Sequence, residues 1–493
     1  MVCGARFRAE KSNKVKSLFE QDLNVVNVGL QSFADNIVAA GGKVAHLSWM
    51  PPAGADAELG WALANLIGDE RVHQANKAAY DRYLAAQPRL ADLVLAKDTI
   101  AGLAKGERRI LHAGPPIAWA EMCGPQQGAI IGAILYEGWA DSLDQAEKIA
   151  ASREVALEPC HHHGAVGPMA GIISPSMPVW VVENTVGNKR AYCNLNEGLG
   201  KVLRFGANSP DVIERLRWLS GEFFTTMQVG VRGLADANLK PLMAQALHMG
   251  DELHNRNAAA SALMFKRLAL SLLGSKLASG AVERALAFVA GNDHFFLNIS
   301  MAACKAMSDA AHGVPGSSMV TVMARNGVNF GIRLSGTGDQ WFEAPANPVD
   351  GLYFPGYTVE DAAADLGDSA ITETNGLGGF AMAASPAIVQ FVGGTAADAT
   401  ANSRRMLRIT LGGNPAFTLP PLNFGGTPAG IDALLVADSG LLPIINTGIA
   451  HKKAGIGQIG AGITTAPMPC FNEAIAALAI GLDVIPTAKR GQA

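Results

Sequence analysis

Residues 245–257, QALHMGDELHNRN, lie in the middle of the longest segment for which the sequence predicts helix. That segment begins with the start signal Ser209-Pro210-Asp211 and continues to about His312. Apolar side chains recur along it at helical spacing, at Leu242, Met249 and Leu253. The stretch therefore predicts a central helical domain.

Polar side chains form a second face of the same predicted helix. His248, Asp251, Glu252 and Asn255 fall within a sector about 100° wide, with His254 just outside it. An imidazole, two carboxylates and an amide on one face suit an acid–base site or a metal site. The alternative is a solvated helix face, although such faces usually carry Lys and Glu rather than His and Asn. If a divalent metal (Mg, Mn or Zn) binds, the expected ligands are His248, Asp251 and His254.

The composition is that of a folded multidomain protein. A chain of 493 residues exceeds one ordinary hydrophobic core, and its 49% hydrophobic and 17% charged residues argue against disorder. Its 55 glycines predict many tight turns and close backbone approaches. The net charge of −4 and the absence of a basic stripe exclude nucleic acid as an expected partner.

The cysteines and the apolar runs indicate a cytoplasmic protein. The six cysteines are scattered and form no C-x-x-C pair, and no signal peptide precedes them, so we expect reduced thiols. The longest run without charge, residues 374–397, is interrupted by glycines and Pro386. We therefore expect no membrane span.

The order of predicted elements gives a mixed α/β, or α+β, multidomain fold. A strand–helix–strand pattern in residues 24–47 predicts a Rossmann-like layer at the N-terminus, and the pair Asn326-Gly327 predicts a β-hairpin near the start of a C-terminal Gly-rich α/β domain. Five divisions are predicted. They are a loose leader (residues 1–18), a Rossmann-like α/β domain (19–105), a second α/β domain (106–207), a helical domain (208–313) and a C-terminal mixed α/β domain (314–493).

Two glycine-rich loops in the C-terminal domain are candidate binding loops. Residues 376–379, GLGG, precede a predicted apolar helix from Phe380 to Phe391, and backbone N–H groups at such a helix start can bind an anion. The second, Gly455–Gly460, fits the spacing G-x-G-x-x-G, but Pro467 and Pro469 rule out the helix that dinucleotide binding requires. The alternative for the first loop is a packing turn, and the alternative for the second is a flexible loop beside the solvated pair Lys452-Lys453.

Charged and polar residues near these loops are further candidates. Lys452 and Arg325 suit a phosphate or carboxylate, and His451 suits proton transfer. Asn446 lies at the mouth of the second loop. The cluster CHHH at residues 160–163 is as consistent with a polar loop as with a metal site.

Five segments together resemble the YlbE-like family, which includes AllG, a subunit of oxamate carbamoyltransferase. They are LHAGPP at 111–116, AQALHMGDE at 244–252, HNRN at 254–257, GDSAITET at 367–374 and IAHK at 449–452. The resemblance covers nearly the whole chain. It implies a cytoplasmic assembly with an FdrA-like protein, itself related to acyl-CoA synthetases, and a third small subunit.

The resemblance also implies a reaction. A carbamoyl group would move between oxalurate, or a related ureido compound, and phosphate in allantoin degradation, giving oxamate and carbamoyl phosphate. Such phosphorolysis needs cations, an anion cradle and a proton donor.

For this reaction we assign candidate roles from the residues. Proton transfer falls to His248, Glu252 and His451. Substrate binding falls to Arg256, Asn257, Arg325, Glu373, Gly378, Gly379, Asn446, Lys452 and Gly457. The alternatives are a metal-dependent amide hydrolase or lyase and a non-catalytic scaffold for the FdrA-like protein. We expect a homo-oligomer in each case.

Overall fold

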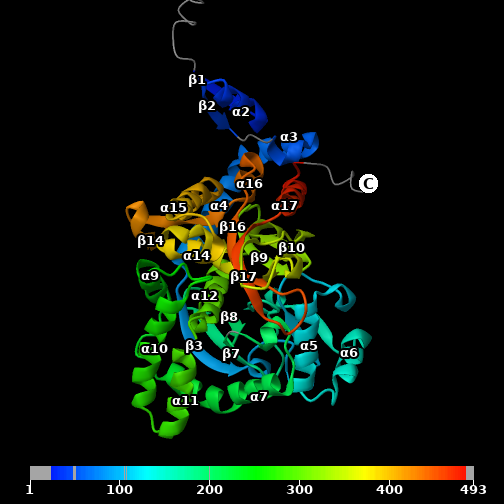
Figure 1. Cartoon of the computed structure of the whole chain (residues 1–493), viewed down its shortest axis with the longest axis vertical. Helices are drawn as coiled ribbons and strands as arrows, with labels where there is room; N and C mark the ends of the chain where they lie inside the picture. The colour runs from blue at the N-terminus through cyan, green and yellow to red at the C-terminus, as the bar shows by residue number, and fades with distance from the viewer. Residues whose placement is uncertain (1–23, 48–50, 105, 107, 199, 485–493) are drawn as a thin grey trace, which may run out of the picture.

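The computed structural model describes residues 24–484 except 48–50, 105, 107 and 199. The predicted leader, residues 1–18, lies outside the described residues. The fold is mixed α/β, with several small sheets among the helices (Figure 1). None of the described helices is long and apolar enough to cross a membrane.

The N-terminal unit confirms the predicted strand–helix–strand order. Strand β1 (Asn24–Val28) pairs in parallel with β2 (Lys43–Leu47), and α2 (Gln31–Ala39) connects them. No further described strand joins this sheet, so a larger Rossmann-like layer is not seen. Figure 1 shows the unit at one end of the molecule, followed by α3 (Ala57–Ile67) and α4 (Glu70–Ala85).

A four-stranded sheet packs against one long buried helix. Its order is β3-β7-β8-β6, with the strands at Pro88–Leu95, Pro178–Asn184, Lys189–Asn194 and Ala165–Val166. Helix α12 (Phe295–Ala311) lies on β7 and β8 and is buried along nearly its whole length. A parallel pair, β4 (Arg109–His112) with β5 (Ala156–Pro159), and helices α5 (Gly124–Tyr136) and α6 (Leu143–Ser152) complete this part.

The predicted helical region is helical but broken at the stretch that carries the polar face. Its helices are α7 (Pro210–Trp218), a π-helical turn (Leu219–Phe223), α8 (Phe224–Arg232), α9 (Lys240–His248), α10 (Ala258–Leu273), α11 (Ser279–Ala290) and α12. Gly250 and Leu253 adopt left-handed φ values of +99° and +66°, which no α-helix accommodates. Residues 249–257 therefore form a loop, and the helical face predicted across them is wrong.

Two further sheets and a hairpin form the C-terminal part. The first has the order β11-β10-β9-β13, with strands at Phe342–Pro345, Asn329–Leu334, Val320–Asn326 and Leu366–Gly367, and it confirms the hairpin at Asn326-Gly327. The second is β12-β17-β16, at Asp350–Tyr353, Gln458–Thr465 and Ile444–Ala450. The hairpin joins β14 (Thr410–Leu419) to β15 (Gly425–Ile431), and the helices are α13 (Ile371–Thr374), α14 (Val389–Val392), α15 (Ala396–Met406), α16 (Ala433–Ser439) and α17 (Met468–Gly481).

Two expectations for the glycine-rich loops have opposite outcomes. The helix predicted from Phe380 to Phe391 is wrong: the chain makes three short 3₁₀ turns, and only residues 389–392 are α-helical. Pro386 contributes to this break, because it cannot donate a helical hydrogen bond. The G-x-G-x-x-G loop leads into strand β17, so the expectation that no helix directly follows this loop is confirmed.

The segment 370–380 connects the two main hydrophobic cores. Ile371 and Leu377 belong to the core around α12, whereas Ala370 and Phe380 belong to the core around Phe330 and Phe471. Polar residues of this segment are therefore held rigidly between two packed bodies.

Candidate active site

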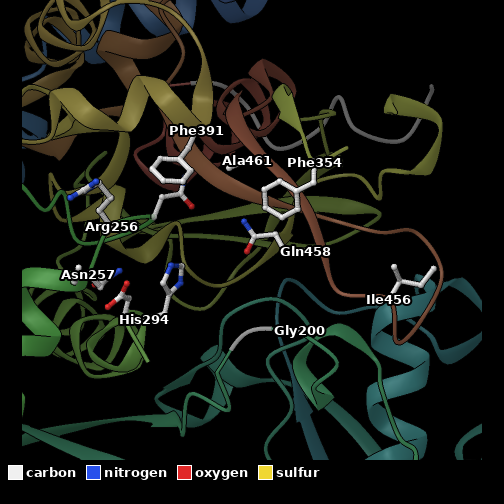
Figure 2. A pocket seen from close by; sticks show the side chains of 12 residues that line it. Gly200, Arg256, Asn257, His294, Phe354, Phe391, Ile456, Gln458 and Ala461 are labelled. Atoms are coloured by element: carbon white, nitrogen blue, oxygen red, sulfur yellow. The ribbon is translucent and has the colours of Figure 1, made fainter. Parts of the chain in front are cut away.

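A cavity of about 440 Å³ opens beside the loop at residues 249–257. Figure 2 shows His294 and Gln458 facing the same space, with the rings of Phe354 and Phe391 above it. The lining comes from the α9–α10 loop, the start of α12, α14 and β17; it comprises Gly200, Asn255, Arg256, Asn257, Ala258, Asp293, His294, Phe354, Phe391, Ile456, Gln458 and Ala461. The cavity is thus mostly apolar, with a few polar groups converging from the loop, as in small-molecule sites.

Three consecutive loop residues bring hydrogen-bonding atoms that lack a protein partner. Asn257 donates from Nδ2 to the carbonyl oxygen of His254 at 2.7 Å, which leaves its buried Oδ1 without a donor. Within the described part of the chain, buried Nδ2 of Asn255 and Nε of Arg256 have no acceptor. Unmade buried hydrogen bonds are costly, and these three atoms are closed to solvent as the side chains now lie, so a ligand with one N–H donor and two acceptors would pair with them after the side chains turn toward the cavity.

Arg256 supplies the positive charge of the cavity. It is the one Lys or Arg among the described residues that line it. The first turn of α10 contributes less, because Asp251 already accepts a hydrogen bond from the N–H of Ala260 at 2.8 Å. A carboxylate or phosphate of a ligand is therefore expected against Arg256.

His254 forms a buried pair with Glu373 directly behind this wall. Its Nδ1 lies 2.8 Å and 3.0 Å from the two carboxylate oxygens of Glu373, and both side chains are almost fully buried. A carboxylate at Nδ1 favours the tautomer with the proton there, which leaves the Nε2 lone pair as a base. The pair therefore has the arrangement of a general acid–base group.

Glu373 is held by the glycines that the sequence predicted to bind an external anion. Gly379 donates its N–H to Oε1 of Glu373 at 2.8 Å, and the N–H of Gly378 goes to the carbonyl oxygen of Glu252. A Cβ at Gly378 would lie 2.1 Å from Oε1 of Glu373 and 3.0 Å from Cβ of His254. The glycines thus allow Glu373 to approach His254, and the anion in the cradle is the protein's own carboxylate.

Glu252 fixes the backbone of the loop. Its carboxylate accepts hydrogen bonds from the N–H groups of His254, Asn255 and Arg256, and from Nδ2 of Asn446 at 3.2 Å. Burial raises the pKa of Glu252 from 4.5 to about 7, against the opposing effect of His254 and the backbone donors. Glu252 thus positions the three residues that line the cavity.

His294 is a neutral wall of the cavity near neutral pH. Burial, and then the nearby charges of Arg204 and His254, lower the pKa of His294 to about 4. A neutral imidazole both donates and accepts a hydrogen bond, so His294 suits an amide or ureido group of a ligand.

Most of the residues singled out by the sequence meet at this site. Those in the cavity wall or the network behind it are Glu252, His254, Arg256, Asn257, Glu373, Gly378, Gly379 and Asn446. Gly457 lies between two lining residues, in a turn with φ of +112° that passes close to Gly200.

The structure does not bring together the three predicted metal ligands. His248 is exposed at the end of α9, where Nε2 lies 2.8 Å from Oγ1 of Thr418, while Asp251 caps α10 and His254 contacts Glu373. They diverge because the chain leaves the helix at His248. In the described residues, no group of three His, Cys, Asp or Glu side chains is placed to hold a metal ion.

Among the described residues, the remaining candidates do not line the cavity. Buried Arg325 makes a bidentate ion pair with Asp365 at 2.7 Å and 2.9 Å. Lys452 donates to the carbonyl oxygen of Glu360, and His451 stacks edge-on against Tyr357. These residues tie segments of the fold together.

The histidines of the CHHH cluster diverge as well. His163 pairs with Glu158 at 2.5 Å, and His162 accepts a hydrogen bond from Nε1 of Trp341 at 2.8 Å. His161 instead points inward, with Nε2 lying 3.6 Å from Asp368.

Sequence reasoning missed His294 and Gln458 at the cavity. His294 follows the turn-forming residues Gly291-Asn292-Asp293, which break the long predicted helix just before α12. That turn was the available signal. Gln458 belongs to the glycine-rich loop but has no distinguishing pattern.

A family model and one relative carry the same description, oxamate carbamoyltransferase subunit AllG. Residues 155–369 match the family described as oxamate carbamoyltransferase subunit AllG, a segment that contains the loop at 249–257. Over 418 residues the chain is 46% identical to the oxamate carbamoyltransferase subunit AllG of Escherichia coli K12, covering 84% of this chain and 99% of that protein.

Two further relatives carry no described activity. The Escherichia coli K12 protein named uncharacterized protein YahG is 45% identical over 463 residues, covering 93% of this chain and 98% of its own. A crystal structure of a conserved protein of unknown function from Enterococcus faecalis V583 has a TM-score of 0.82 and 46% identity, covering 84% of this chain and 98% of that one.

Proposed function

The chain belongs to the AllG family, and from this premise we propose that it is the subunit of an oxamate carbamoyltransferase-type complex that binds the ureido substrate. The naming of its relative as a subunit supports a multi-subunit enzyme. The proposed reaction is carbamoyl transfer between oxalurate, or a related ureido compound, and phosphate. The proposed partners are an FdrA-like subunit and a third small subunit.

The unpartnered atoms of the loop wall are the observation that carries this proposal. Oxalurate has a carboxylate, carbonyl oxygens and ureido N–H groups. Arg256 Nε suits the carboxylate, Asn255 Nδ2 suits a carbonyl oxygen, and Asn257 Oδ1 suits an N–H group. The rings of Phe354 and Phe391, which are 44% and 45% exposed, offer apolar surface against which a bound group could pack.

The proposed chemistry uses the His254–Glu373 pair for the proton. An oxygen of hydrogen phosphate attacks the ureido carbonyl carbon, and the bond from that carbon to the oxamate nitrogen breaks. His254 Nε2 takes the proton of hydrogen phosphate and delivers it to the leaving nitrogen. Glu373 holds the imidazole and stabilises its transient positive charge.

Variants of the pair test this role. Co-expressed with its two proposed partners, the chain is assayed for phosphate-dependent loss of oxalurate. His254→Gln is expected to lower kcat by about 10²- to 10⁴-fold, the range for a general acid–base group, and Glu373→Gln to lower it as well. His248→Ala is the matched control, because His248 is exposed and contacts Thr418. Full activity of His254→Gln, or loss of activity in His248→Ala alone, would contradict the assignment.

A variant of Arg256 tests substrate binding separately. Arg256→Gln keeps a polar, hydrogen-bonding side chain, although a shorter one, and removes the charge, so it is expected to raise KM for oxalurate more than it lowers kcat. An unchanged KM would remove Arg256 from the binding site.

A scaffold role is the second candidate, and the N-terminal unit favours it. The face of β1 and β2 opposite α2 exposes Val26, Val28 and Leu47 by 62%, 54% and 54%. A two-stranded parallel sheet with an open apolar face is rarely stable without a cover, and we propose that the FdrA-like subunit covers it.

Complex formation tests the scaffold candidate. Val28→Asp is expected to abolish co-purification with the FdrA-like subunit, whereas the isosteric Val28→Thr retains it. Normal co-purification of Val28→Asp would show that the partner does not cover this face.

A further inference from the structure

Two side chains offer open hydrogen-bonding atoms to the cavity in addition to the loop wall. His294 and Gln458 both line it, and Figure 2 shows them facing the same space. Both are half-buried, and no described residue forms a hydrogen bond with either ring nitrogen of His294 or with Oε1 of Gln458. In contrast to the unpartnered atoms of Asn255, Arg256 and Asn257, these three atoms are open to the cavity as the side chains now lie.

The side-chain amide of Gln458 is held in one orientation. Its Nε2 donates to the carbonyl oxygen of Gly460 at 3.0 Å, and only the NH₂ end of an amide can pair with a carbonyl oxygen. Gly448 on the neighbouring strand β16 leaves room for this amide, since a Cβ there would lie 3.0 Å from Nε2. Gln458 also begins strand β17, which pairs with β12 on one side and β16 on the other. Oε1 is therefore a fixed hydrogen-bond acceptor.

The turn before α12 fixes the position of His294. The N–H of His294 donates to Oδ1 of Asn292 at 3.1 Å, and Nδ2 of Asn292 donates to Oδ1 of Asn196 at 3.2 Å. From the other side, the hydroxyl of Ser261 on α10 donates to the carbonyl oxygen of Asp293 at 2.9 Å. Asn292, Asn196 and Ser261 are all buried, so hydrogen bonds from two directions hold this turn beside the cavity.

Together the two side chains match a carbamoyl group. The imidazole of His294 is neutral near neutral pH and therefore has one N–H donor, whereas Oε1 of Gln458 only accepts. A carbamoyl group presents the complementary pair, a carbonyl oxygen beside an NH₂ group. A carboxylate or an ester has no N–H for Gln458, so one of its oxygens would meet the lone pairs of Oε1. The pair thus selects for an unsubstituted amide end.

We propose that His294 and Gln458 bind the carbamoyl group that is transferred, with His294 donating to its carbonyl oxygen and Gln458 accepting from its NH₂ group. This inference rests on the proposed function, in which the loop at residues 249–257 takes the oxamate half of the substrate. As the phosphate oxygen adds to the carbonyl carbon, the electron pair of the C=O bond moves to the oxygen, and it returns when the bond to the oxamate nitrogen breaks. The N–H of His294 stabilises the negative charge on that oxygen, and Gln458 determines specificity.

Binding to the full chain tests the pairing without catalysis. Oxalurate and N-acetyloxamate, which has a methyl group in place of the terminal NH₂, are titrated separately by calorimetry. The parent is expected to bind oxalurate about tenfold more tightly, because N-acetyloxamate leaves Oε1 of Gln458 without a donor. Gln458→Met is expected to bring the ratio of the two Kd values to about one. Gln127→Met is the matched control and should leave the ratio unchanged, since Gln127 also donates to a backbone carbonyl but does not line the cavity.

Variants of His294 distinguish a hydrogen-bond donor from an acid–base group. In the complex with the two proposed partners, His294→Leu is expected to lower kcat about 10²- to 10³-fold, the loss for one oxyanion donor. In the chain alone it should raise the Kd of oxalurate and of N-acetyloxamate alike, because both have the carbonyl oxygen. His294→Gln keeps an N–H donor and is expected to have a kcat at least about tenfold above that of His294→Leu.

Each result supports or overturns one assignment. Equal affinity of the parent for the two compounds, or an unchanged ratio in Gln458→Met, overturns the role of Gln458. Equal values of kcat in His294→Leu and His294→Gln overturn the role of His294 as a donor. A parent complex that does not consume oxalurate overturns the proposed function, and the Kd values then decide the pairing alone. A parent chain that binds neither compound overturns both.

Discussion

The raised pKa of Glu252 predicts a pH dependence of the unfolding free energy, which can be measured without knowing the substrate. The pKa of Glu252 lies near 7 in the folded protein, because burial disfavours the charged carboxylate, whereas 4.5 is its ordinary value. Between these values the folded state keeps a proton that the unfolded state has lost. Raising the pH through this window therefore destabilises the fold, and the loss is complete above about pH 7.

The size of the effect follows from the two pKa values. They differ by 2.5 pH units, 7 minus 4.5, and about 1.36 kcal/mol per unit gives about 3.4 kcal/mol of unfolding free energy. About 2.5 kcal/mol of this falls between pH 5 and pH 8. Glu252→Gln removes the titration and keeps an oxygen at the position of Oε1, which accepts most of the backbone hydrogen bonds.

The assay compares the unfolding free energies of the parent and of Glu252→Gln in urea at several pH values. The free energy of the variant minus that of the parent should rise by about 2.5 kcal/mol from pH 5 to pH 8. Other titrating groups cancel in this difference, including His294, His112 and His312, whose lowered pKa values act in the opposite direction.

A second measurement locates the proton. The infrared band of a protonated carboxyl group should titrate near pH 7 in the parent and lose one component in Glu252→Gln. Asp368, whose pKa is also raised to about 7 by burial, should supply a component that remains. A stability difference that does not change with pH would refute the reasoning, because Glu252 would then be ionised in both states.

Two further substitutions test the packing around the site. Gly378→Ala, at φ of +54°, forces a Cβ against Glu373 and should cost more than the strain of about 1–2 kcal/mol for a left-handed residue. Gly164→Ala, at φ of +66° and ψ of +15° with no atom nearer than 3.4 Å to the added Cβ, should cost that strain alone, and thermal midpoints compare the two variants. Arg325→Met leaves Asp365 buried without its counter-charge and should cost about 3–5 kcal/mol in urea unfolding, and a cost near zero would show that water reaches Asp365.

The sequence predicted local strands, helices and turns better than it predicted the points at which a helix is interrupted. The N-terminal strand–helix–strand unit and the hairpin at Asn326-Gly327 were predictable, because each depends on short-range periodicity and on one turn. The break after His248 was not, because a left-handed Leu253 is stabilised by the surrounding structure and has no sequence signal.

The site residues were largely predictable as a group, but their roles were not. Glu252, His254 and Glu373 were each selected for their chemistry, and the fold brings them into one network. The partner of His254, however, is 119 positions away, and a long-range pairing of this kind cannot be obtained from periodicity. The helical periodicity favoured His248 as a site residue, because it assumed a helix where the chain forms a loop.

Asp251 and Glu252 accept hydrogen bonds from backbone N–H groups that the loop at residues 249–257 leaves without helical partners. In a continuous helix the backbone carbonyl groups would accept these hydrogen bonds instead. A chain that leaves α9 at His248 and enters α10 at Ala258 exposes several backbone N–H groups inside the protein, where water cannot satisfy them. Asp251 accepts one from the start of α10, and Glu252 accepts three from the loop. With these donors satisfied by side chains, the polar atoms of Asn255, Arg256 and Asn257 are not needed to hold the loop backbone. The acceptor oxygens of Asp251 and Glu252 therefore hold the loop in place beside the cavity, and a variant that removes these oxygens from either residue should impair binding before it impairs folding.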